Sequence, residues 1–225
     1  MTLAQSKITV PLIGYGAGTK WYTGDNSSPV NKELVQSVHD ALACGYRHLD
    51  LAEMYGTDAS IGEALRTQSI PRHELFITSK VFKNIENIEK ACADVLSRLG
   101  IDYLDLWLIH APFFDRSKIS LEQAWKQMEK LVDDGKVKAI GVSNFQKTHL
   151  EELFALQPRI KPAANQSRLS SEIRRENDHR SLFSRAPSVY VRGVTRLARL
   201  LQIQGGGDRS LQSIGIDYLQ AGWTR

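Results

Sequence analysis

Helix-like and strand-like patterns alternate along the first 166 residues. Amphipathic stretches, in which apolar residues recur every three or four positions, alternate with short, mostly apolar runs typical of buried strands. The expected helices span residues 30–44, 58–66, 85–99, 120–134 and 148–156. The expected strands span residues 12–18, 46–49, 75–79, 103–109, 137–142 and 162–166. Gly45, Gly100 and Gly135 follow three of these helices and predict where each one ends.

This order of elements predicts an α/β fold. Strands and helices that alternate with a period of about thirty residues imply right-handed βαβ units and a parallel sheet. Polar residues recur where the strands end, and in a closed barrel they would converge on one mouth. An open doubly wound sheet is the alternative, but the glycine-rich stretch Gly14–Gly18 does not open a helix directly. We therefore expect a (β/α)₈ barrel of the TIM type, incomplete because about six units are visible.

The pattern stops after Gln166. Through that residue the chain has 13 Lys, 6 Arg and 20 Asp or Glu, a net charge of −1. From Ser167 onward it has no Lys, 10 Arg and 5 Asp or Glu, a net charge of +5. We expect residues 1–166 to form the barrel portion and residues 167–225 to be a Ser/Arg-rich segment, disordered apart from one amphipathic helix over 189–203. The change from Lys to Arg usage is what a shifted reading frame or a retained intron would produce.

Composition narrows the class of protein. The hydrophobic fraction of 42% and the charged fraction of 24% are those of a globular protein, and no apolar run is long enough to span a membrane. Cys44 and Cys92 lie within expected helices without metal-ligand spacing, so we expect buried thiols, no metal site and a reducing, cytoplasmic location. Aromatic residues do not alternate with the arginines of residues 167–225, so nucleic-acid binding is not expected.

Three strand-end residues and a loop tyrosine suit the reduction of a carbonyl group. A free phenol has a pKa of about 10 and donates its proton poorly near neutral pH. A nearby ammonium, such as that of Lys80, would lower the pKa of Tyr55, and the Asp50 carboxylate would hold the lysine in place. His110 could donate a hydrogen bond to a developing alkoxide. A hydride would come from elsewhere, and hydroxyl and amide groups at the ends of later strands could hold a nicotinamide carboxamide: Ser143, Asn144 and Gln166.

Several motifs in order resemble the aldo-keto reductase family. Residues 45–50 (Gly-Tyr-Arg-His-Leu-Asp), followed by Tyr55-Gly56 and Ile61-Gly62, are similar to its first signature. Met128 and residues 138–145 (Lys-Ala-Ile-Gly-Val-Ser-Asn-Phe) are similar to its second. Residues 76–80, 105–110 and 164–166 fall at the expected places, so the resemblance covers about residues 8 to 166.

The resemblance implies an NADPH-dependent barrel enzyme that reduces aldehydes and ketones to alcohols. The residues that match the catalytic positions of the family are Asp50, Tyr55, Lys80 and His110. Those that match its cofactor contacts are Gly18, Thr19, Asp50, Ser143, Asn144 and Gln166. Trp21 resembles an aromatic residue of its substrate pocket, and His110 would orient the substrate. Trp107, inside an expected strand, is equally suited to the pocket wall and to the core, so the predicted substrate residues are Trp21, Trp107 and His110.

The chain also departs from the family pattern. Asp58 stands where the signature has Glu or Gln, and Ala111 stands where many members have tryptophan. After Gln166 the acidic residue, the His-Pro step and the later elements that grip the adenosine 2′-phosphate are not found. The alternative is therefore an inactive, truncated barrel that acts through protein–protein contacts at its open sheet edges. A complete barrel would be a monomer that acts on a small carbonyl compound.

Overall fold

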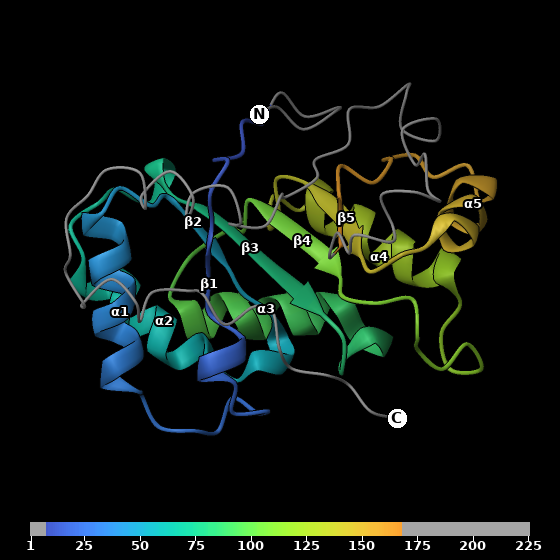
Figure 1. Ribbon diagram of the computed structural model, residues 1–225. Coiled ribbons are helices and arrows are strands. Elements are labelled where there is room, and N and C mark those ends of the chain that lie inside the picture. Colours follow the sequence, from blue (N-terminus) through green and yellow to red (C-terminus); the bar gives the residue numbers. More distant parts are fainter. Residues whose placement is uncertain (1–7, 168–225) are drawn as a thin grey trace, which may run out of the picture.

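The structure is a computed structural model that describes residues 8–167. The strands among these residues form one six-stranded parallel sheet in the order β1-β2-β3-β4-β5-β6. Their bounds are β1 (Tyr15–Gly16), β2 (His48–Asp50), β3 (Phe76–Val81), β4 (Leu106–Ile109), β5 (Ile140–Ser143) and β6 (Asn165–Gln166). Neighbouring parallel strands need a crossover connection, and the helices provide these connections (Figure 1).

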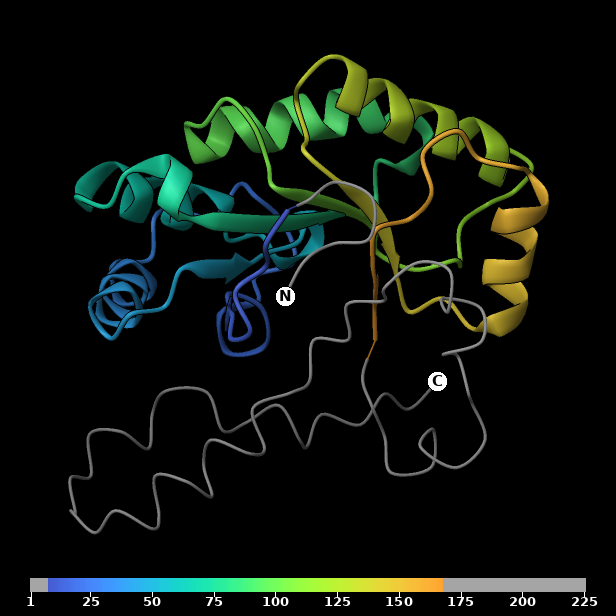
Figure 2. The same cartoon turned by 90° about the horizontal axis from the view of Figure 1, so that it is seen from above.

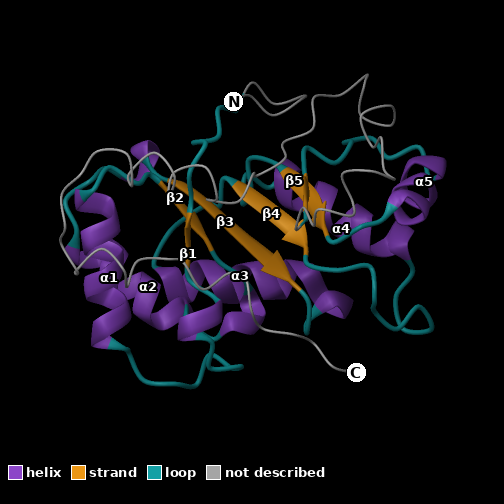
Figure 3. Ribbon diagram, viewed as in Figure 1, coloured by secondary structure: helices purple, strands orange, loops and turns teal. Residues whose placement is uncertain are grey.

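One α-helix follows each of the first five strands. The helices are α1 (Lys32–Ala43), α2 (Asp58–Thr67), α3 (Ile88–Leu99), α4 (Leu121–Asp133) and α5 (Lys147–Ala155). Figure 2 shows these helices along the outer side of a sheet that curls, and Figure 3 shows the strands in front of them. Short 3₁₀ turns lie in the connections: η1 (Thr19–Trp21), η2 (Glu53–Tyr55), η3 (Arg72–Glu74) and η4 (Ile85–Asn87).

Helix ends follow the local sequence. The Asn31 side chain accepts hydrogen bonds from the backbone N–H groups of Glu33 and Leu34 at the start of α1. Ser120 and Gln123 form a capping box at the start of α4, as their spacing predicts. These caps satisfy backbone donors that the first helical turn leaves without partners.

The two faces of the sheet pack differently. Alternate residues of a strand point to opposite faces. Trp107 and Ile109 of β4 join the large core between the sheet and the helices. Leu106 and Leu108 join a smaller apolar cluster on the opposite, inner face. A curled parallel sheet with helices on its outer side is an incomplete (β/α)₈ barrel, as the sequence predicts, and not an open sheet covered on both faces.

Strand boundaries and one cysteine differ from the sequence predictions. β3 continues through Lys80 to Val81, because Val81 still pairs with Ile109. Cys44, predicted to be buried inside a helix, is exposed. The cause is that α1 ends at Ala43 and Gly45 adopts a left-handed φ of 92°, so Cys44 falls at the helix end. Cys92 is buried as predicted. The predictions for residues 168–225 lie outside the described residues.

A buried carboxylate joins three segments at the amino-terminal end of the sheet. Asp105 is 4% exposed. Its oxygens accept hydrogen bonds from Arg72 Nη2 at 2.7 Å, from the backbone N–H of Ile77 at 2.9 Å and from Lys138 Nζ at 3.0 Å. Both cations also lie 4.1 Å from the ring centroid of Tyr103. Asp105, directly before β4, thus meets two cations and a backbone amide, which compensate for the removal of its carboxylate from water.

The described residues contain neither a helix that could span a membrane nor a group of side chains that could hold a metal ion. Of the helices within residues 8–167, none has both the length and the apolar character needed to cross a bilayer. Within the same range, His, Cys, Asp and Glu side chains do not gather in groups of three or more that could hold a metal ion.

Candidate active site

A buried lysine lies at the centre of the candidate site. Lys80 extends from β3, and its side chain is only 2% exposed. Its Nζ donates hydrogen bonds to Asp50 Oδ1 at 2.6 Å and to the backbone carbonyl of Leu51 at 2.8 Å. Asp50 ends β2, and its other oxygen, Oδ2, accepts a hydrogen bond from Gln166 Nε2 at 3.1 Å. This carboxylate therefore joins the second, third and sixth strands at their carboxyl ends.

Tyr55 and His110 lie beside the lysine. Tyr55 is the last residue of η2, and the centroid of its ring is 5.4 Å from Lys80 Nζ. The ring centroids of Tyr55 and His110 are 5.8 Å apart, with an angle of 83° between the ring planes. The structure thus brings together the four predicted catalytic residues, which are separated by up to sixty positions in sequence.

The surroundings of the His110 imidazole favour its neutral form. Burial lowers its pKa to about 4, and the nearby Lys80 ammonium acts in the same direction. Its Nδ1 atom is buried and has no hydrogen-bond partner among the described residues. A neutral imidazole can donate one hydrogen bond to a bound oxygen without carrying a net charge into the site.

Amide and hydroxyl groups gather at the ends of the last two strands. Ser143 Oγ donates to the backbone carbonyl of Gln166 at 2.8 Å, and Asn144 Nδ2 donates to the carbonyl of His110 at 2.9 Å. Asn144 adopts a left-handed φ of 59°, a conformation that asparagine tolerates better than most residues. Within residues 8–167, the side-chain oxygens of Asn144 and Gln166 accept no hydrogen bond. These free acceptors match the two N–H donors of a carboxamide, so the cluster fits a nicotinamide ring.

The first loop, residues 17–31 between β1 and α1, lies against Tyr55. A Cβ atom at Gly18 would be 3.0 Å from the Tyr55 ring, so this position has little room for a side chain. Thr19 begins η1 with a positive φ of 36°. Trp21, which ends the same turn, is partly buried and donates from Nε1 to the Tyr15 hydroxyl at 3.1 Å.

Trp107 does not lie with these groups. It is fully buried in the core between the sheet and the helices, because it occupies an outward-facing position of β4. We therefore leave Trp107 out of the substrate pocket that we propose below. Phe82 lies at the site instead: its ring centroid is 6.0 Å from that of His110. Its position directly after β3 would have been the only sequence signal for this role.

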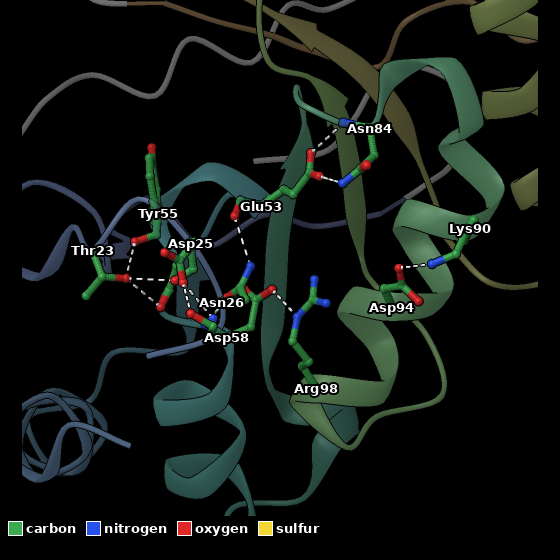
Figure 4. Close-up of polar contacts among 12 residues, drawn as sticks. Thr23, Asp25, Asn26, Glu53, Tyr55, Asp58, Asn84, Lys90, Asp94 and Arg98 are labelled. Carbon is green, nitrogen blue, oxygen red and sulfur yellow. Dashed lines mark hydrogen bonds and ion pairs between the residues drawn. The ribbon is translucent and has the colours of Figure 1, made fainter. Parts of the chain in front are cut away.

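A second buried carboxylate lies next to the Tyr55 turn. Asp58, the first residue of α2, is fully buried, and its Oδ2 accepts a hydrogen bond from Arg98 Nε at 3.0 Å (Figure 4). Asp58 Oδ1 has no partner among the described residues. Burial raises the pKa of Asp58 to about 6, although the Arg98 charge opposes this shift.

The raised pKa of Asp58 predicts a pH-dependent stability. Between about pH 4 and pH 6 the folded chain holds a proton that the unfolded chain has lost, so the free energy of unfolding falls as the pH rises. Two pKa units correspond to about 3 kcal/mol. The variant Asp58→Asn lacks this titrating group. We therefore expect the free energy of unfolding of Asp58→Asn minus that of the parent protein to rise by about 3 kcal/mol from pH 4 to pH 7, as measured by urea unfolding. The control Asp94→Asn, at an exposed ion pair with Lys90, should show no such trend. Parallel curves for the parent and Asp58→Asn would contradict the prediction.

Comparison with known proteins identifies the family. The sequence model of the aldo/keto reductase family matches residues 13–186. The NAD/NADP-dependent indole-3-acetaldehyde reductase of Schizosaccharomyces pombe is 37% identical over 203 residues, which are 90% of this chain and 71% of that protein. An aldo/keto reductase of Brucella melitensis has a similar structure, with a TM-score of 0.64 and 34% identity over 75% of this chain and 62% of that one. An aldo-keto reductase of Bombyx mori, solved in complex with NADP, gives a TM-score of 0.63 and 30% identity over 74% of this chain and 57% of that one.

The structure is an incomplete α/β barrel that brings Asp50, Tyr55, Lys80 and His110 together near the carboxyl ends of its strands. This chain belongs to the aldo/keto reductase family. It spans about half the length of several other relatives, for example 48% of the glyoxal reductase of Bacillus subtilis. The family match ends at residue 186, twenty residues beyond Gln166, where the sequence motifs end. The division at residue 166 and the nature of the segment beyond it stay predictions.

Proposed function

We propose that this chain reduces aldehydes or ketones to alcohols with NADPH, and that Tyr55 is the proton donor. The observation that supports this proposal most strongly is the buried Lys80 ammonium. It is bonded to Asp50 and lies 5.4 Å from the Tyr55 ring centroid. An ammonium at this place favours loss of the phenol proton, and the carboxylate holds the ammonium in position.

Each residue of the site has a separate role in the proposed reaction. NADPH, when bound, supplies a hydride to the carbonyl carbon. His110, neutral near pH 7, donates a hydrogen bond that orients the carbonyl oxygen, and Tyr55 transfers its proton to that oxygen as negative charge develops there. The Lys80 ammonium then stabilises the phenolate until a proton is regained, and Asp50 holds Lys80 in place. Trp21 and Phe82 provide apolar walls that exclude water from the reacting atoms.

The cofactor is proposed to lie across the carboxyl ends of the strands. Gly18 and Thr19 would contact it from the first loop, together with Asp50. Ser143, Asn144 and Gln166 would hold the nicotinamide carboxamide. Two comparisons support NADP over an unrelated cofactor: the S. pombe relative is named as NAD/NADP-dependent, and the B. mori structure contains NADP.

Cofactor binding can be tested by thermal unfolding. A ligand that binds only the folded state at about one hundred times its Kd adds about 2.7 kcal/mol to the free energy of unfolding. We expect NADPH to raise the Tm of the full chain, and Asn144→Gly to need about tenfold more NADPH for the same shift. This replacement keeps the left-handed backbone at position 144 and removes only the amide side chain. NADH in parallel tests the preference for the phosphate. No change in Tm at saturating NADPH would contradict the proposed function for this chain.

A further inference from the structure

Glu53 is a buried carboxylate that the proposed reaction does not use. It begins the 3₁₀ turn η2, which ends at Tyr55, and is 5% exposed. A charged side chain removed from water needs compensating hydrogen bonds. Within residues 8–167, the side-chain partners of Glu53 are not cations but N–H groups of a second loop, the residues 82–84 that follow β3.

Each oxygen of Glu53 has its own set of donors. Oε2 accepts from the backbone N–H groups of Phe82 at 2.9 Å and Lys83 at 3.1 Å, with a longer contact of 3.5 Å to that of Asn84. Oε1 accepts from the side-chain amide Nδ2 of Asn84. Figure 4 shows this side chain reaching across from the Tyr55 turn to Asn84. One carboxylate therefore fixes the backbone of a neighbouring loop by several bonds at once.

The two loops that Glu53 joins flank the proposed proton donor and its histidine. Tyr55 lies two residues after Glu53 in the same turn. On the other loop, the Phe82 ring packs against that of His110. Just before this loop, the carbonyl oxygen of Val81 accepts a hydrogen bond from the backbone N–H of His110 at 2.9 Å. The bonds of Glu53 thus link the segment that carries the phenol to the segment that packs against the imidazole.

The opposite side of the same turn is held by the first loop. The backbone N–H of Thr23 donates to the carbonyl of Tyr55 at 2.9 Å, and Asn26 Nδ2 donates to the carbonyl of Glu53 at 3.1 Å. A Cβ atom at Gly56 would lie 2.1 Å from the Asp25 carbonyl oxygen, so the turn is closely packed there. In Figure 4 the Tyr55 ring points away from these contacts. The backbone below the ring is therefore fixed on both sides.

From these contacts we propose that Glu53 is a positioning residue: by binding residues 82–84 it sets the distance between the Tyr55 phenol and the Lys80 ammonium. This inference rests on the proposed function only for its effect on turnover. The effect of position on the phenol itself is electrostatic and needs no substrate. If the turn moves away from Lys80, the stabilisation of the phenolate weakens and the pKa of Tyr55 rises.

The chain allows an exchange of donor and acceptor that tests the hydrogen bonds directly. In Glu53→Gln, the new amide oxygen can accept from residues 82 and 83, but the new NH₂ group faces the NH₂ group of Asn84. In Asn84→Asp, two carboxylates face each other. In the double variant Glu53→Gln/Asn84→Asp, the NH₂ group at position 53 can donate to the carboxylate at position 84, so every bond is restored with its polarity reversed at one place.

We expect each single variant to lower kcat about ten- to a hundredfold, because small displacements of a catalytic group have effects of this size. The alkaline limb of the pH–rate profile should move to higher pH. The Kd for NADPH should stay unchanged, and the double variant should recover most of kcat and the original alkaline limb. The control Glu63→Gln, at an exposed carboxylate paired with Arg66 on α2, should match the parent protein.

A titration separates this proposal from the proposed function. The tyrosinate absorbance of the parent protein minus that of Tyr55→Phe reports ionisation of Tyr55 without any substrate. We expect the Tyr55 transition to lie at higher pH in Glu53→Gln and to return in the double variant, even if no carbonyl compound is turned over. An unshifted transition in both single variants would overturn the positioning role. A shifted and rescued transition without turnover would uphold it and count against the reductase activity alone.

Discussion

Tyr55→Phe is expected to abolish carbonyl reduction while it leaves cofactor binding intact. Removal of a general acid lowers rates by about a hundred- to ten-thousandfold. The replacement removes only the hydroxyl group, and the aromatic ring keeps its contacts with Gly18 and His110. The loss should therefore appear in kcat, whereas the Kd for NADPH and the Tm should change little. Steady-state kinetics together with cofactor titration check both expectations.

Tyr46→Phe is the matched control. Tyr46 lies just before β2, at the end of that strand opposite to Asp50. It is partly buried and packs against the core between the sheet and the helices. It should keep the activity of the parent protein. If Tyr55→Phe retained more than about a tenth of the parent kcat, the role of Tyr55 as the proton donor would be wrong, since a general acid contributes at least a hundredfold.

Asp105→Ala is expected to produce the largest loss of stability among the substitutions considered. It leaves Arg72, Lys138 and the backbone N–H of Ile77 without their shared acceptor. Removal of one partner of a buried ion pair costs about 3–5 kcal/mol. Both cations retain some access to water, with exposed side-chain fractions of 22% and 44%, so we expect a value near the lower limit. Urea unfolding measures the loss.

Asp102→Ala provides the comparison for this loss. Asp102 is an exposed carboxylate three residues earlier on the same approach to β4. Surface substitutions of this kind change stability by about 0.5 kcal/mol or less. Equal effects of the two substitutions would show that the cluster around Asp105 does not stabilise the fold.

The sequence predicts the fold well because helix and strand patterns depend on local periodicity. The stripe that contains Leu34 and Val38 predicts α1, and both residues are fully or almost fully buried in the core. The spacing of Ser120 and Gln123 likewise predicts the capping box that begins α4. Strand ends are predicted less well, since pairing with a neighbour decides them: β1 is only two residues long because it pairs with β2 only at Tyr15 and Gly16.

The candidate site is predicted in part. Strand-end positions and family motifs point to Asp50, Lys80 and His110, and the barrel brings them together. The role of Glu53 could not be predicted, because its partners are backbone N–H groups of a loop about thirty residues away. Asp58 looked like a minor departure from the family signature, but it is a buried partner of Arg98. The two faces of β4 decide the place of Trp107, and an all-apolar strand gives no sign of which face a residue occupies.

In the proposed reaction a hydride passes from NADPH to the carbonyl carbon of the substrate. The most direct measurement is to incubate the full chain with an aldehyde and NADPH carrying deuterium at the transferable position, and to analyse the alcohol by mass spectrometry. We predict that deuterium appears on the carbinol carbon with the parent protein and is nearly absent with Tyr55→Phe. An alcohol without deuterium, or no alcohol from a protein that binds NADPH, would contradict the account.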